Sequence, residues 1–252
     1  MKISLIGYGK MGKIIEQIAI SRRHTISYKI TQNNQQDLQL LSPENTDVVI
    51  EFTQPESAFD NIATCLHKKI PVICGTTGWL ARKPEIETIC LQNHTAFLQA
   101  SNFSIGVNIF FKVNELLAKL MNEQSQYEVA LTEIHHTEKK DAPSGTAIVI
   151  ADGVLKHSNR KDAWTLLENE QANIDTNHIV NNVAENLLPI TALRLPNVPG
   201  THTISYHSTQ DTISFTHEAH SREGFALGAV IAAEWLKDKK GNFTMSDVIN
   251  SL

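Results

Sequence analysis

The chain has 252 residues, of which 41% are hydrophobic and 19% charged, and its formal net charge is -5 at pH 7. That length allows one large domain or two small ones with a buried core, and the negative charge argues against a dedicated nucleic-acid binder. No apolar run approaches the roughly 18 residues of a membrane span, and the run before Gly7 is too short for a signal peptide. The cysteines, Cys65, Cys74 and Cys90, have no CxxC spacing and lie in or beside apolar runs, so we expect buried free thiols and a cytoplasmic location.

The first predicted element is a strand over Lys2–Ile6, and a glycine-rich loop follows it. Apolar residues then recur at helical spacing from Ile14 to Ala19. The loop has the pattern GxGxxG and consists of Gly7, Tyr8, Gly9, Lys10, Met11 and Gly12. Between a strand and a helix this pattern is typical of a dinucleotide site, because its glycines allow a tight turn, the approach of a pyrophosphate and close packing of helix on strand. The pattern therefore predicts a dinucleotide-binding fold, in which Lys10 could also reach a phosphate.

The next predicted strand, Thr25–Ile30, bears on the choice of cofactor. Sites that prefer NAD usually place an acidic residue at the end of this strand, where it binds the ribose hydroxyls. Here the strand is followed by Thr31, and Lys29 stands just before its last residue. With no carboxylate at the expected position, the sequence leaves NADH and NADPH open, and Lys29 favours tolerance of a 2′-phosphate.

Strands and helices continue to alternate up to about residue 104. Strands are expected over Asp47–Phe52, Pro71–Cys74 and Thr95–Gln99, and an amphipathic helix over Pro55–His67. This alternation predicts a Rossmann-like doubly wound parallel sheet. Such sheets bind ligands at the carboxyl ends of their strands. Two polar segments fall at those ends: Gly75-Thr76-Thr77-Gly78 and Ala100-Ser101-Asn102-Phe103. For the first segment, a ligand-binding loop is favoured over a simple turn.

The pattern changes after residue 104 to a long helix followed by several strands. The helix is expected over Ile105–Met121 and the first strand over Tyr127–Ile134. Residues 156–189 are polar and show only a weak apolar pattern around Trp164–Leu167. Strands then follow over Ile190–Leu195, Thr201–His207 and Thr212–Ala219, the last two forming a hairpin. Successive strands predict a second, α+β domain with a mixed or antiparallel sheet, whose uncovered face could support self-association. A final apolar helix, Phe225–Leu236, is expected to return to the first domain.

The most informative segment is Glu133-Ile-His-His-Thr-Glu-Lys-Lys-Asp-Ala-Pro-Ser-Gly-Thr-Ala147, between a predicted strand and a helix. Ser144 is a suitable N-cap for that helix, and the start of a helix favours an anion through its N–H groups and its dipole. Two histidines and two lysines stand within a few residues of it. The segment therefore predicts a site that binds a carboxylate and delivers a proton. The alternative is a solvated surface loop, because Asp-Ala-Pro-Ser-Gly also makes good turns.

Taken together, these segments closely resemble the dihydrodipicolinate reductase (4-hydroxy-tetrahydrodipicolinate reductase) family of bacterial lysine biosynthesis, nearly end to end. The segment Glu133–Ala147 is similar to the family signature E-x-H-H-x-x-K-x-D-A-P-S-G-T-A. Support comes from Glu51-Phe-Thr-Gln-Pro55, Gly75-Thr-Thr-Gly78, Asn102-Phe-Ser-Ile-Gly-Val-Asn108, Gly200-Thr-His202 and His220-Ser-Arg222. The resemblance implies an NADH- or NADPH-dependent enzyme of diaminopimelate and lysine biosynthesis that reduces a cyclic dicarboxylate, without a metal and as a homotetramer.

The resemblance also implies roles for particular residues. His135 would be the general acid and Lys139 its catalytic partner, while His136, Gly145 and Thr146 would bind a substrate carboxylate. The cofactor would lie against Gly7 to Gly12, Thr31, Gly75 to Thr77, and Ala100 to Phe103. Residues 1–104 and 222–252 would form the dinucleotide-binding domain, and residues 105–221 the substrate-binding and tetramerisation domain. The chain departs from the family pattern in a glycine loop one residue shorter, in a short loop between the second and third strands and in Thr31 at the ribose position.

Two other classes of protein remain alternatives. One is another two-domain Rossmann dehydrogenase, of the aspartate or homoserine type, although the paired histidines suit neither chemistry well. The other is a non-catalytic dinucleotide-sensing module that has kept the fold and lost the reaction. The pairing of His135 with Lys139 argues against the second.

Overall fold

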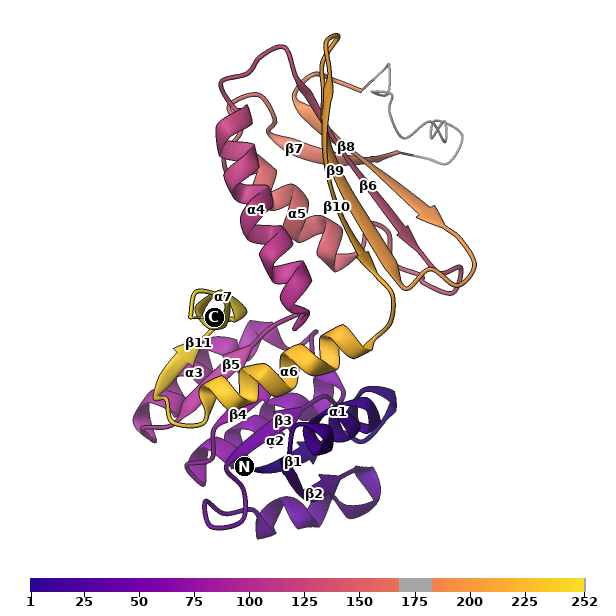
Figure 1. The fold of residues 1–252 in the computed structure, drawn as a ribbon. Coiled ribbons are helices and arrows are strands. Elements are labelled where there is room, and N and C mark those ends of the chain that lie inside the picture. The colour runs from indigo at the N-terminus through magenta and orange to yellow at the C-terminus, as the bar shows by residue number, and fades with distance from the viewer. Residues whose placement is uncertain (168–182, 252) are drawn as a thin grey trace. The chain divides into compact units, whose positions relative to one another are not determined.

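The computed structural model describes residues 1–167 and 183–251. The chain divides into two compact units. Unit 1 consists of Met1–Asn108 and Arg222–Leu252, and unit 2 of Ile109–Ser221. Helix α4 (Ile105–Met121) begins in unit 1 and continues into unit 2. Each unit has its own sheet (Figure 1).

Unit 1 is built on a parallel six-stranded sheet with the order β11-β5-β4-β3-β1-β2. Its strands are β1 (Lys2–Ile6), β2 (Thr25–Ile30), β3 (Val48–Glu51), β4 (Val72–Cys74), β5 (Ala96–Gln99) and β11 (Gly241–Phe243). Its helices are α1 (Lys10–Ser21), α2 (Pro55–His67), α3 (Lys83–Gln92), α6 (Glu223–Leu236) and α7 (Met245–Ile249), with 3-10 helices η1 (Gln32–Leu40) and η2 (Leu80–Arg82).

Apolar side chains cover both faces of this sheet, as a doubly wound fold requires. One core joins the sheet to α1 and α6 through residues such as Ile15 and Val230. The other joins it to α2 and α3 through residues such as Ile62 and Ile86. The strand order reverses between β1 and β3, and ligands of open α/β sheets bind at the carboxyl edge beside such a reversal.

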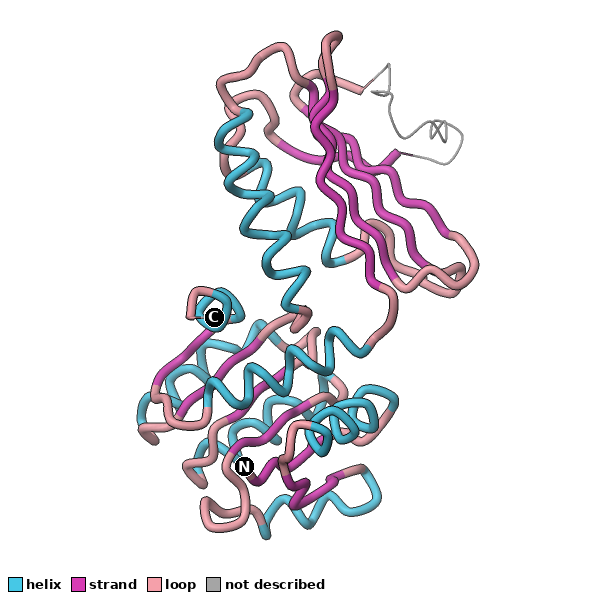
Figure 2. The backbone as a smooth tube through the Cα atoms, viewed as in Figure 1, coloured by secondary structure: helices cyan, strands magenta, loops and turns pink. Residues whose placement is uncertain are grey.

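Unit 2 carries a mixed five-stranded sheet with the order β10-β9-β6-β8-β7. Its strands are β6 (Glu128–His135), β7 (Ala163–Leu167), β8 (Leu187–Arg194), β9 (Gly200–His207) and β10 (Thr212–Ala219). Strand β6 pairs in parallel with β8 and antiparallel with β9, and β9 forms a hairpin with β10. Helices α4 and α5 (Gly145–Leu155) cover one face of the sheet, and no helix among the described residues of the unit covers the other face (Figure 2).

The predicted fold class is confirmed, and so are most predicted elements. The long helix has the expected bounds, and the final apolar helix belongs to unit 1. Five elements had not been expected: the helix α3, the strand β11, the helix α7 and the 3-10 helices η1 and η2. The polar segment 156–189 contains β7 and the start of β8, while its residues 168–182 lie outside the described part of the chain. The three cysteines are buried and free, as predicted. No helix of the described ranges is long and apolar enough to span a bilayer.

Candidate active site

A polar site forms in unit 2 where three neighbouring strands change from apolar to charged along one face. Alternate residues of a strand share a face, so Glu133 and His135 follow the core residues Val129 and Leu131 on β6. Likewise His202 shares a face of β9 with the core residue Ile204, and Arg194 shares a face of β8 with Ile190. Glu133 is directly opposite His202, and His135 opposite Arg194. The register of the strands therefore collects these four side chains at one end of the sheet.

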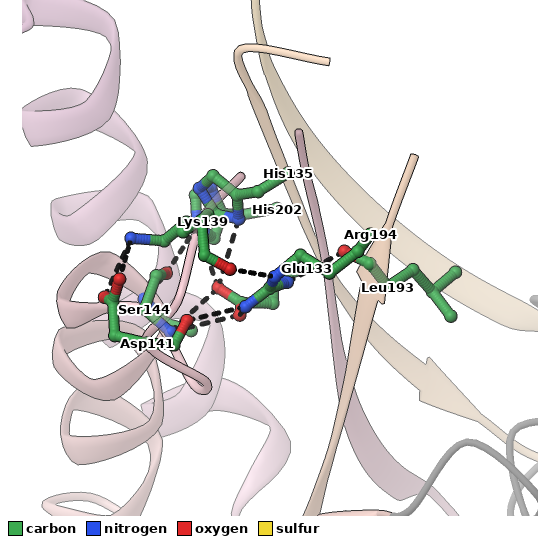
Figure 3. Close-up of polar contacts among 9 residues, drawn as sticks. Glu133, His135, Lys139, Asp141, Ser144, Leu193, Arg194 and His202 are labelled. Carbon is green, nitrogen blue, oxygen red and sulfur yellow. Dashed lines mark hydrogen bonds and ion pairs between the residues drawn. The ribbon is translucent and has the colours of Figure 1, made fainter. Parts of the chain in front are cut away.

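Glu133 is the centre of this cluster and is fully buried. The backbone N–H of Ser144 donates to both of its carboxylate oxygens at 3.1 Å, and Nη2 of Arg194 lies 3.2 Å from Oε1. Nδ1 of His135 and Nε2 of His202 lie 3.5 and 3.7 Å from Oε2 (Figure 3). Burial alone would raise the pKa of Glu133, but its contacts with His202, Ser144 and His135 outweigh burial and lower the pKa to about 2. Glu133 is therefore ionised at neutral pH.

His135 is 7% exposed, and its environment disfavours the protonated ring. Burial lowers its pKa to about 4; the attraction of Glu133 opposes this, while the charges of His202, Lys139 and Arg194 add to it. The imidazole is thus neutral at pH 7 in the free protein. To act as an acid, it needs a bound anion that favours the imidazolium form.

Helix α5 begins beside this cluster. Ser144 is its N-cap: Oγ accepts the N–H of Ala147 at 3.1 Å and lies 3.2 Å from Nε2 of His202. Gly145 and Thr146 are the first two helical residues, and a Cβ added at Gly145 would meet nothing within 4 Å. The N–H groups of a first turn are not used by the helix itself and favour an anion. The predicted anion-binding helix start thus has its expected cap, with open space at its first residue.

Lys139 lies in the loop between β6 and α5 and already has an anionic partner. Its Nζ lies 2.8 and 2.7 Å from the two carboxylate oxygens of Asp141. Asp141 is 62% exposed at its side chain, and an ion pair to such a group contributes little net stability. A ligand carboxylate can therefore take the place of Asp141. The neighbouring histidine, His136, has a buried Nδ1 with no hydrogen-bond partner in the described part of the chain.

The site contains residues that the sequence prediction did not include. Glu133 and His202 stand inside quoted motifs, yet neither was assigned a role. Asp141 was also quoted, but its pairing with Lys139 was not foreseen. Arg194 had no local signal, because only the pairing of β8 with β6 brings it to Glu133.

The same cluster offers donor atoms of the kind that metals use. One atom each from Glu133, His135 and His202 lie within 4.8 Å of one another. The Glu133 oxygens, however, are engaged by Ser144 N–H and by the Arg194 guanidinium. A cation placed there would face that guanidinium, so the charges suit an anionic ligand better than a metal ion.

In unit 1, the predicted cofactor loops line two adjacent cavities. The larger, of about 730 Å³, is lined by Gly7, Tyr8, Gly9 and Thr31 among others. The second, of about 410 Å³, is lined by Gly9, Lys10, Met11, Gly12, Gly75, Thr76 and Thr77 among others. The segment Ala100–Phe103 lines neither cavity. In it, Asn102 accepts the N–H of Ser104 at 2.9 Å, and the Phe103 ring packs against Phe52.

The glycine loop leaves room for a pyrophosphate. Gly7 has a φ of +92°, and a Cβ there would lie 1.9 Å from the carbonyl oxygen of Phe52, so only glycine fits. Gly9 is the N-cap of α1; no side chain caps this helix, and a Cβ at Gly9 would meet nothing within 4 Å. An uncapped helix start behind open space is suited to the phosphates of a dinucleotide. Lys29, by contrast, lies 3.1 Å from Glu16, which also accepts the Tyr8 hydroxyl.

A parallel sheet with such a loop at its switch point defines the class: the chain has a Rossmann-type dinucleotide-binding fold. Family models place it more narrowly. Residues 1–103 match the dihydrodipicolinate reductase N-terminus, and residues 106–249 match the dihydrodipicolinate reductase C-terminus. The chain therefore belongs to the dihydrodipicolinate reductase family.

Individual relatives agree with this assignment. The 4-hydroxy-tetrahydrodipicolinate reductase of Christiangramia forsetii is 46% identical over 252 residues, covering 100% of this chain and 99% of the relative. The enzyme of the same name from Buchnera aphidicola is 35% identical over 206 residues, covering 81% and 72%. Among solved structures, the dipicolinate-bound dihydrodipicolinate reductase of Paenisporosarcina sp. TG-14 has a TM-score of 0.76, at 19% identity and 97% coverage of both chains. This last likeness supports the fold.

Proposed function

We propose that the chain reduces 4-hydroxy-tetrahydrodipicolinate, the substrate for which its relatives are named, with a nicotinamide dinucleotide, as a step of diaminopimelate and lysine biosynthesis. The observation that carries the proposal is the neighbourhood of His135 in unit 2. There an imidazole, an ammonium group and an anion-binding helix start lie within one strand–loop–helix segment. A ring with two carboxylates and a carbon that must be protonated requires these three groups.

Binding of the two carboxylates is the first requirement. One carboxylate would accept N–H groups from the start of α5 at Gly145 and Thr146, assisted by His136. The other would replace Asp141 on Lys139. Since an exposed ion pair contributes roughly 0 to 1 kcal/mol, this exchange costs little. Lys139 is then a charged partner for the ligand.

Proton delivery is the second requirement. Loss of the 4-hydroxyl as water gives an unsaturated ring, and a bound reduced nicotinamide would supply a hydride to C4 of that ring, which leaves an enamine. The imidazolium of His135 then gives its proton to C3 and becomes neutral, and a proton from solvent restores the imidazolium. Because burial makes His135 a weak base in the free protein, the negative charge of the bound ring is needed to raise its pKa and increase the protonated fraction at neutral pH.

The cofactor would lie along the two cavities of unit 1, with its pyrophosphate at the start of α1 and Thr31 near the adenosine ribose. We expect comparable use of NADH and NADPH, or a lean toward NADPH, because no carboxylate occupies the ribose position. The pairing of Lys29 with Glu16 limits its attraction for a 2′-phosphate. Discrimination should stay below about tenfold, which is the effect of a charge contact of about 1.4 kcal/mol.

Assembly and location complete the proposal. Helices α4 and α5 cover only one face of the unit 2 sheet (Figure 1), and the opposite face presents hydroxyl pairs such as Thr203–Thr216 and Ser205–Ser214. We expect this face to mediate a homotetramer, which light scattering of the purified protein would test. Buried free thiols suit the reducing cytoplasm.

The direct test is an assay of the purified protein with the product of dihydrodipicolinate synthase and either reduced cofactor. Consumption of the cofactor only when that substrate is present supports the proposal. Turnover with aspartate or homoserine instead would assign the chain to another dehydrogenase type. Cofactor binding without turnover of any of these compounds would indicate a sensing module.

A further inference from the structure

We propose that Glu133 is a positioning residue, which holds the His135 ring with its proton on Nδ1 and thereby presents Nε2 to the substrate. The inference rests on the proposed role of His135 as the proton donor. It adds a residue for which the sequence had suggested no role.

The first argument is the environment of the His135 Nδ1 atom. That atom is buried, and no described residue gives it a hydrogen bond of ordinary geometry. Its contact is Oε2 of Glu133 at 3.5 Å. An ionised carboxylate only accepts hydrogen bonds, so the favourable neutral tautomer has the proton on Nδ1, directed at Glu133. Nε2 is then the atom that exchanges a proton with the ligand.

The second argument is the space beside Nε2. Gly200 faces this atom, and a Cβ added there would lie 3.0 Å from Nε2. Gly200 also has a φ of +158°, a backbone angle that residues other than glycine rarely adopt. The chain therefore places a carboxylate at one edge of the ring, and a residue without a side chain at the other.

The third argument is that Glu133 cannot exchange the proton itself. It is fully buried, and its oxygens accept the Ser144 N–H and the Arg194 guanidinium. It acts on the substrate only through the groups that it holds. Ser144 caps α5, and Arg194 also donates to the carbonyl oxygens of Lys139 and Asp141 at 3.3 and 2.7 Å. One carboxylate thus fixes the imidazole relative to the helix start and the lysine loop (Figure 3).

Glu133→Gln tests the proposal, because it keeps the shape and one oxygen for Ser144 while it removes the charge. An amide nitrogen next to Nδ1 would also favour the opposite tautomer. We expect kcat to fall on the order of 100-fold with KM changed less than about threefold, and the alkaline limb of the kcat–pH profile, where His135 loses its proton, to shift to lower pH. The titratable and charged groups that face His135 are Glu133, His202, Lys139 and Arg194, and the substitution changes only Glu133. Glu133→Asp should restore part of the lost kcat and part of the shift in the pH profile.

Glu128→Gln is the matched control. Glu128 lies on the same strand at its other end and pairs with Arg160 and Lys161 at 3.2 and 3.0 Å. This substitution also removes a carboxylate from basic partners, but it should leave kcat and the pH profile unchanged. If Glu133→Gln lowered kcat without moving the alkaline limb, Glu133 would have only a structural role and the proposal would be wrong.

A second measurement uses the unmodified protein. It depends neither on catalytic turnover nor on whether a variant folds. Nitrogen-15 spectra of the His135 ring near pH 7 should show the tautomer protonated on Nδ1. The tautomer protonated on Nε2 would overturn the proposal. Failure of the wild-type protein to reduce the substrate would instead refute the proposed function and leave the tautomer result intact.

Discussion

Binding of a dicarboxylate should become tighter as the pH falls, because the ligand and a proton on His135 favour each other. Burial lowers the pKa of this imidazole to about 4, so in the free protein it takes up its proton only in acid. A carboxylate about 5 Å from the protonated ring attracts it by about 3 kcal/mol at an effective dielectric constant near 20. The protonated form should therefore bind the ligand about 100-fold more tightly than the neutral form.

The consequence can be measured by calorimetric titration with pyridine-2,6-dicarboxylate. At pH 5 about one-tenth of the free protein carries the proton, whereas at pH 7.5 almost none does, so the apparent affinity should rise about tenfold between these pH values. The ligand's own protonation is measured separately and subtracted. In His135→Gln the rise should vanish. An affinity independent of pH in the wild-type protein, or an equal rise in the variant, would refute the reasoning.

Four further outcomes are expected. His135→Gln should lower kcat on the order of 100-fold with a modest change in KM, measured by steady-state kinetics; an unchanged kcat would remove His135 from the role of acid. Lys139→Ala should impair both KM and kcat, because it leaves a ligand carboxylate unpaired, and normal kinetics would support a solvated loop instead. Thr146→Val should mainly raise KM, so a loss of kcat at constant KM would contradict its placement. In urea unfolding, the stabilising effect of Glu133 is complete above pH 4.5 and disappears as the pH falls through its folded pKa of about 2. The stability difference between wild type and Glu133→Gln should therefore shrink by about 3 kcal/mol over that range, and a constant difference would contradict this pKa.

The regular elements could be predicted where burial leaves a clear periodic pattern. Strand β6 alternates buried and half-buried residues along its whole length, and helix α4 keeps an apolar stripe over 17 residues. Helix α3 buries only Ile86 and Cys90, so its apolar pattern is too sparse to identify. Strand β11 has three residues, and β7 lies at the edge of its sheet with one buried residue. Such elements form because neighbours cover them, which no local pattern records.

The candidate site shows the same limit. His135, Lys139 and the helix start stand close together in the sequence, so they could be proposed as one site. Arg194 and His202 reach Glu133 only because β8 and β9 pair with β6 in one register. A shift of one residue would turn each side chain to the opposite face. That register depends on the packing of the whole sheet, and a single sequence does not state it.

The central claim is that the imidazole of His135 and the start of α5 converge on one doubly negative ring. A crystal structure with pyridine-2,6-dicarboxylate and a nicotinamide cofactor bound would test it most directly. We expect one carboxylate to accept the N–H groups at Gly145 and Thr146, with His135 Nε2 directed at the ring. A ring bound elsewhere, with that imidazole turned into solvent, would contradict the account.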